Sequence, residues 1–152
     1  MRRSEALAVL SREHHQALFV ALRLRRADAG SAAAERTRFL AFWAAEGEEH
    51  FRSEEELLFP AYARVGDARH PLLERALGDH VAIRAQAARL SAVVEVDPEV
   101  LHELGTALAA HVRLEERELF PVIEEALGAD ELLSLARKLA GPADPGVPGV
   151  GG

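Results

Sequence analysis

Two stretches of the chain repeat the same residues at the same spacing, and the repeated residues are of types that bind metal ions. His50 is followed four residues later by Glu54, and His111 is followed four residues later by Glu115. Each stretch continues into a Leu-Phe-Pro triplet, and the two histidines are 61 residues apart. Residues four apart lie one turn apart on the same face of a helix, so each imidazole and carboxylate could hold an ion together. The repeat therefore predicts two halves of one metal site.

Composition limits the kind of site and the kind of partner. The 152 residues are enough for one domain, and the absence of cysteine excludes disulfides, iron–sulfur clusters and thiolate zinc sites. Any metal must then be held by nitrogen and oxygen. The net charge of −7 disfavours nucleic acid and anionic membranes as partners. With neither a secretory-type leader nor an apolar run of about eighteen residues, we expect a cytoplasmic protein.

Apolar residues recur at spacings of three and four through most of the chain, which is typical of amphipathic helices. The pattern predicts four long helices, over about 7–24, 31–60, 73–90 and 97–121, and a short fifth helix over 131–139. Four such helices with short connections predict an all-α fold, an antiparallel up-and-down four-helix bundle. We expect residues 1–140 to form this one domain. The glycine- and proline-rich tail, 141–152, is expected to be disordered.

Each long helix carries one histidine near the middle of its apolar stripe, where an imidazole without a partner would be costly to bury. These histidines are His14, His50, His80 and His111. With Glu54 and Glu115 they exceed what one tetrahedral ion uses, and carboxylates are suited to bridging two ions. Only the first member of each acidic run that begins at Glu54 and Glu115 is expected to face inward. The pattern predicts a dinuclear centre, for which iron, manganese or zinc would be suitable.

Two neighbouring positions leave alternatives open. His14 lies at the centre of the apolar arc of the first helix, while the adjacent His15 lies about 100° away. We favour His14 as the inward residue, but the leucine-rich window Leu18–Leu22 keeps His15 as an alternative. Glu46 lies one turn before His50, so it is a candidate either for a further ligand or for an acceptor of an imidazole N–H.

These motifs resemble the hemerythrin-like (HHE cation-binding) family over about residues 4–125. The resemblance rests on a histidine in the first helix, on His50-Phe51-Arg52-Ser53-Glu54, on Asp79-His80, on His111-Val112-Arg113-Leu114-Glu115 and on the two Leu-Phe-Pro triplets. It implies a four-helix bundle with a non-haem di-iron centre. The matching ligands are His14 or His15, His50, Glu54, His80, His111 and Glu115.

The chain also departs from the best-known members of that family. Oxygen-carrying hemerythrins have a second histidine four residues after the first on the third helix, where this chain has Arg84 after His80. They also have an aspartate five residues after the last histidine, whereas Glu115 follows His111 at four. The set of four histidines and two glutamates is similar to that of iron-cluster repair proteins linked to nitric-oxide stress. Those proteins carry a cysteine-bearing segment that this chain lacks.

The sequence therefore predicts a protein that binds or senses oxygen, nitric oxide or peroxide at two iron ions. An alternative is an enzyme with ferroxidase or peroxidase-type activity in the handling of iron or of oxidative and nitrosative stress. Nothing in the sequence identifies a pocket for an organic substrate or a proton shuttle. A further alternative is a metal-free helical interaction module, which requires the four histidines to be incidental.

Overall fold

The structure, a computed structural model, describes residues 3–141, and all regular structure within this range is helical. The helices are α1 (Glu5–Arg25), α2 (Ala32–Phe42), α3 (Glu48–Ser53), α4 (Phe59–Ala63), α5 (Pro71–Ala92), α6 (Pro98–Leu114), α7 (Phe120–Ala126) and α8 (Ala129–Ala140). Three wider π-helical turns join some of them, η1 (Trp43–Gly47), η2 (Glu54–Leu58) and η3 (Glu115–Leu119). The predicted all-helical class is confirmed. The tail predicted to be disordered falls, apart from Gly141, outside the described residues.

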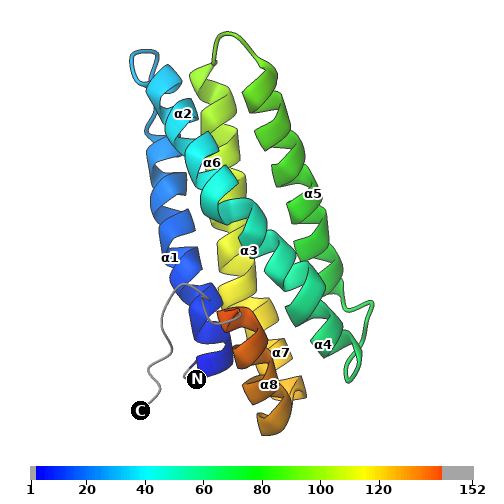
Figure 1. The fold of residues 1–152 in the computed structure, drawn as a ribbon. Helices are drawn as coiled ribbons and strands as arrows, with labels where there is room; N and C mark the ends of the chain where they lie inside the picture. The colour runs from blue at the N-terminus through cyan, green and yellow to red at the C-terminus, as the bar shows by residue number, and fades with distance from the viewer. Residues whose placement is uncertain (1–2, 142–152) are drawn as a thin grey trace, which may run out of the picture.

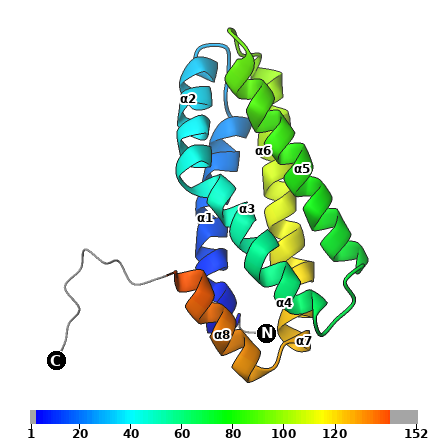
Figure 2. The ribbon, with the colours of Figure 1, turned by 45° about the vertical axis from the view of Figure 1, so that its right-hand side comes forward.

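The helices form four rods that lie side by side (Figure 1). The first rod is α1, the second runs without a break from α2 to α4, the third is α5, and the fourth runs from α6 to α7. Each rod returns toward the end from which the previous one started, and the turned view shows the same order (Figure 2). The short helix α8 follows the fourth rod and packs against α1 and η2. No helix in the described part of the chain is long and apolar enough to cross a membrane.

Side-chain caps and prolines define where three of the helices begin. Ser4, His70 and Asp97 each accept a hydrogen bond from a backbone N–H in the first turn of the helix that follows. Pro71 and Pro98 occupy first-turn positions, where the missing N–H costs nothing because it would have no helical partner. These features fix the starts of α1, α5 and α6, and through them the register of the first, third and fourth rods.

Two apolar clusters fill the bundle, one on each side of a polar layer. One cluster takes side chains from 17–51, 83–90 and 101–112, and the other takes side chains from 7–10, 58–76 and 114–135. The four buried histidines, with Glu54 and Glu115, lie near the points where each rod passes from one cluster to the other. α1 and α6 pack closely at Gly105, where an added methyl group would lie 2.7 Å from the carbonyl oxygen of Ala21. The site is thus held in a tightly packed interior.

Pro60 was expected to end or bend the second helix, and the fourth helix was expected to end near Pro121; neither proline ends its rod. The rods continue to Ala63 and Ala126. Proline lacks an N–H and clashes with the carbonyl four residues earlier, which an ordinary α-helix cannot accommodate. Here the turn before each proline is widened, so that Phe59 N–H bonds the carbonyl of Glu54 five residues back. Such π-turns insert one extra residue and are frequent at functional sites.

Candidate metal centre

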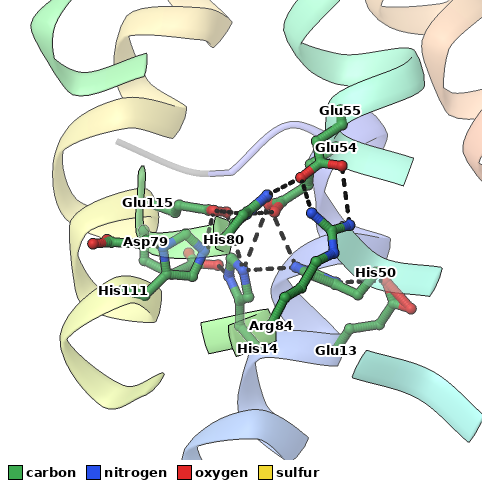
Figure 3. Close-up of polar contacts among 11 residues, drawn as sticks. Glu13, His14, His50, Glu54, Glu55, Asp79, His80, Arg84, His111 and Glu115 are labelled. Carbon is green, nitrogen blue, oxygen red and sulfur yellow. Dashed lines mark hydrogen bonds and ion pairs between the residues drawn. The ribbon is translucent and has the colours of Figure 1, made fainter. Parts of the chain in front are cut away.

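The four histidines and two glutamates come together in the buried interior of the bundle (Figure 3). They are His14 on α1, His50 and Glu54 on the second rod, His80 on α5, and His111 and Glu115 on the fourth rod. All six residues are between 0% and 8% exposed. His15 is exposed, so the structure turns His14 inward, as favoured from the helical arc. Each rod contributes one imidazole to the same buried layer.

The six side chains form two groups of four potential ligands. His14 and His50 belong to one group and His80 and His111 to the other, and the ligand atoms of each group lie within 4.8 Å of one another. The paired Nε2 atoms are 3.1 Å apart in the first group and 3.2 Å apart in the second. Two nitrogens about 2.0–2.1 Å from one ion, at right angles, would be about 3 Å apart. Both spacings fit an imidazole pair on one ion.

Glu54 and Glu115 belong to both groups. Glu54 lies between His50, with Oε2 3.4 Å from Nε2, and His80, with Oε1 3.0 Å from Nε2. Glu115 lies between His14, with Oε2 3.3 Å from Nε2, and His111, with Oε1 2.6 Å from Nε2. Each carboxylate therefore directs one oxygen toward each group.

The carboxylate oxygens of Glu54 and Glu115 provide a test of whether a metal fits. All four are buried, and none has a hydrogen bond from the described residues. A buried anionic oxygen without a partner is costly, whereas a cation between the imidazoles and carboxylates would satisfy all four. The donor set fits one cation in each group, with both carboxylates shared.

Each imidazole is held from behind by a further acidic side chain. These four outer carboxylates pair through Nδ1, Glu116 with His14 at 2.6 Å, Glu13 with His50 at 3.0 Å, Glu55 with His80 at 2.6 Å and Asp79 with His111 at 3.1 Å. A carboxylate beside Nδ1 accepts a hydrogen bond from the Nδ1 proton and so keeps the proton on that nitrogen. The lone pair of Nε2 then faces the centre and is free to bind a metal ion. All four rings are thus oriented for metal binding.

Sequence reasoning assigned two of the outer carboxylates wrongly. Glu55 and Glu116 were expected to face solvent, but they contact His80 and His14 on neighbouring rods. A signal was available, because each of the two inward glutamates is followed directly by a second glutamate. A residue next to an inward one lies 100° around the helix and reaches the adjacent rod when the rods are close.

Without a metal ion, the negative charges of the carboxylates raise the pKa of the buried imidazoles, although burial by itself would lower it. Burial alone would lower the imidazole pKa, but contacts with Glu115 and Glu54 raise the pKa of His80 from 6.5 to about 9. Glu115 likewise raises the pKa of His111 to about 10. Although burial opposes it, contacts with Glu54 and His111 hold the pKa of Glu115 well below its usual value. The site attracts positive charge, which protons supply in the metal-free protein.

The two groups differ in how they are covered. A small cavity of about 20 Å³ adjoins both imidazoles of the first group, His14 and His50, but only His111 of the second, with Phe42 and Trp43 among its apolar walls. The turn η1 has no counterpart in the fourth rod, and a methyl group at Gly47 would lie 2.6 Å from the Trp43 ring. Because Gly47 has no side chain, the indole ring of Trp43 can pack against it and form part of the cavity wall.

In the second group, aromatic rings cover His80. The ring of Phe51 stacks on His80 with centroids 3.8 Å apart and an interplanar angle of 7°. Phe59 lies over the same imidazole with centroids 5.9 Å apart. His80 is 0% exposed as a result. The cavity adjoins the other three imidazoles and not His80.

Two other residues considered from the sequence lie outside the ligand groups. Glu46 lines the cavity but is exposed, and it makes no hydrogen bond or ion pair with any described residue. The structure gives the acceptor role at His50 to Glu13 instead. Arg84, four residues after His80, makes two hydrogen bonds to Glu55.

Comparison with known proteins agrees with this geometry. The family described as the hemerythrin HHE cation binding domain matches residues 7–123, which include all six potential ligands and all four outer carboxylates. No curated protein and no solved structure matches the chain. Since the match covers most of the 152 residues, the chain belongs to the hemerythrin HHE cation-binding family.

Proposed function

We propose that the chain is a non-haem di-iron protein that binds or senses a small ligand, namely oxygen, nitric oxide or peroxide. His14 and His50 would hold one ion, His80 and His111 the other, and the two shared glutamates would bridge them. The proposal rests above all on the four buried carboxylate oxygens without hydrogen bonds. A metal-free interaction module would leave only protonated imidazoles to compensate these oxygens. The proposal includes the antiparallel four-helix arrangement of the rods, which would bring one imidazole from each to the same level.

The donor set supports iron without selecting it against manganese or zinc. All three ions accept imidazole and carboxylate ligands, and no sulfur donor is present to favour a softer ion. When bound, iron would supply redox chemistry and open coordination positions. The residues of the chain would orient the imidazoles through the outer carboxylates and exclude water with stacked rings such as Phe51 on His80.

The cavity supports a small ligand over an organic substrate. At about 20 Å³ it has room for little more than one water-sized molecule. Its walls include three of the four candidate ligand imidazoles, His14, His50 and His111, so a diatomic molecule there would lie beside both proposed metal positions. The proposed route of access to the centre is therefore through this cavity.

Metal content and ligand binding can be tested with adjacent histidines as matched variants. Protein stripped of metal and loaded anaerobically with ferrous iron should contain about two irons per chain by elemental analysis. After oxidation, added azide should produce a new charge-transfer absorption band. His14→Ala should lose iron and the band, whereas His15→Ala should keep both because its side chain is exposed. Equal behaviour of the two variants, or wild-type protein that takes up no iron, would refute the proposal.

One observation favours a catalytic version of the same centre. Two carboxylates, Glu13 and Glu46, line the cavity beside the first metal position, where they could attract ferrous iron or accept a proton. Ferroxidase and peroxidase assays should then show many turnovers per centre. A reaction that stops after one equivalent would leave binding or sensing as the function.

A further inference from the structure

The side chain of Arg84 contacts two residues that hold His80 in place, Glu55 and Phe51. Its Nη1 and Nη2 donate to Glu55 at 2.7 and 3.0 Å, and Glu55 accepts the Nδ1 proton of His80 at 2.6 Å (Figure 3). The guanidinium carbon also lies 5.6 Å from the centre of the Phe51 ring. Phe51 is the ring that stacks on His80. The Arg84 guanidinium thus contacts both the Glu55 carboxylate, which accepts the Nδ1 proton of His80, and the Phe51 ring, which stacks on the His80 imidazole.

The contact with Glu55 restricts the carboxylate more than a single hydrogen bond would. A guanidinium has a rigid planar fork that matches both oxygens of a carboxylate, so the pair fixes the carboxylate plane. Here Oε2 of Glu55 is shared between Arg84 and His80. The Arg84 and Glu55 side chains are 32% and 26% exposed, so water screens them only in part. The orientation of the His80 ring is therefore set through this pair.

The other outer carboxylates do not depend on Arg84. Glu13 and Asp79 have no arginine partner within residues 3–141. Glu116, behind His14, is contacted by Arg3 at the start of the chain, with Nη2 3.0 Å from Oε2. Through the outer carboxylates, loss of Arg84 would thus disturb His80 of the second group and neither imidazole of the first.

We propose that Arg84 is a positioning residue for the metal position held by His80 and His111, acting through Glu55 and Phe51. The inference rests on the proposed dinuclear site. It assigns a role to a side chain that contacts no ligand atom, and it predicts that the two metal positions can be weakened separately. Loss of an outer contact to a metal ligand typically costs 10–100-fold in metal affinity.

The test compares Arg84→Gln with Arg75→Gln, which changes an exposed arginine on the same helix that makes no ion pair with any described residue. Anaerobic titration with ferrous iron should show two equivalents bound by wild-type protein and by Arg75→Gln. In Arg84→Gln one equivalent should bind about 10–100-fold more weakly and the other unchanged. Equal weakening of both equivalents, or no difference from Arg75→Gln, would overturn the proposal.

A second comparison tests the route through Glu55. If Arg84 acts mainly through this carboxylate, Glu55→Gln combined with Arg84→Gln should weaken the second equivalent little more than Glu55→Gln alone. Fully additive losses would refute that route.

A third measurement needs no metal. In the metal-free protein, the Nδ1 proton of His80 should give a protected imidazole resonance in NMR spectra that is lost in Arg84→Gln and retained in Arg75→Gln. If wild-type protein bound no iron, the proposed function would fail, while this resonance would still decide whether Arg84 positions His80. Retention of the resonance in Arg84→Gln would refute the positioning role.

Discussion

Raising the pH should destabilise the metal-free protein, and bound metal should suppress this effect. Without metal, protons on His80 and His111 compensate the buried carboxylates, and their pKa values are raised from 6.5 to about 9 and about 10. A group whose pKa is higher in the folded than in the unfolded state stabilises the fold fully below the unfolded value. That contribution is lost as the pH rises through the folded value. The loss should therefore extend from about pH 6.5 to about pH 10.

The structure sets the size of the effect. One pKa unit corresponds to about 1.4 kcal/mol, so a rise from 6.5 to about 9 at His80 amounts to about 3 kcal/mol. The side chain is 0% exposed, so solvent does not screen it directly. The contribution of His111 does not simply add, because both imidazoles face Glu115. For a chain of this length, about 3 kcal/mol lowers the melting temperature by about 6–12 °C.

Thermal unfolding followed by circular dichroism from pH 6 to pH 10.5 would measure this effect. Metal-free wild-type protein and the exposed control His15→Gln should both lose about 6–12 °C more than His80→Gln across this range. Metal-loaded wild-type protein should lose much less, because the ion replaces the protons. The reasoning fails if metal-free wild-type protein and His80→Gln have parallel pH profiles, or if metal does not change the slope.

Three substitutions test other parts of the structure. Glu115→Gln should abolish binding of both irons, because both groups share this carboxylate, and elemental analysis showing one iron per chain would contradict the shared site. Gly47→Ala should displace the Trp43 ring, because the added methyl group would lie 2.6 Å from it. Trp43 is the single tryptophan, so an unchanged fluorescence emission spectrum would contradict this displacement. Gly105→Ala should lower the free energy of unfolding, measured with urea, by about 1–2 kcal/mol. The added methyl group would lie too close to the Ala21 carbonyl oxygen, and this clash outweighs the gain in helix propensity. An unchanged free energy of unfolding would contradict this packing.

The inward residues could be predicted because they follow the period of their own helices. His50 and Glu54 share a face whatever the neighbouring rods do, and the same holds for His111 and Glu115. The structure brings all four into one buried layer. Their role as metal ligands stays a prediction, which the iron-loading experiment addresses.

The outer contacts could not be predicted from helical period alone. Glu55 and Arg84 lie beside inward positions, and whether such residues reach solvent or a neighbouring rod depends on the spacing and rotation of the rods. The continuation past Pro60 had a similar cause, since it depends on the π-turn η2, which the apolar pattern does not indicate. Both features arise from how the rods pack against one another.

The order of donors along the chain divides the molecule into two equivalent helical hairpins. Glu13, His14, His50 and Glu54 in the first correspond to Asp79, His80, His111 and Glu115 in the second. Each hairpin contributes one of the two glutamates shared by both ligand groups, so the proposed centre requires both hairpins but not the peptide that joins them. Cleavage of the connection between Ala63 and Pro71 would leave the complete donor set distributed over two fragments, and the centre could form again wherever those fragments reassociate.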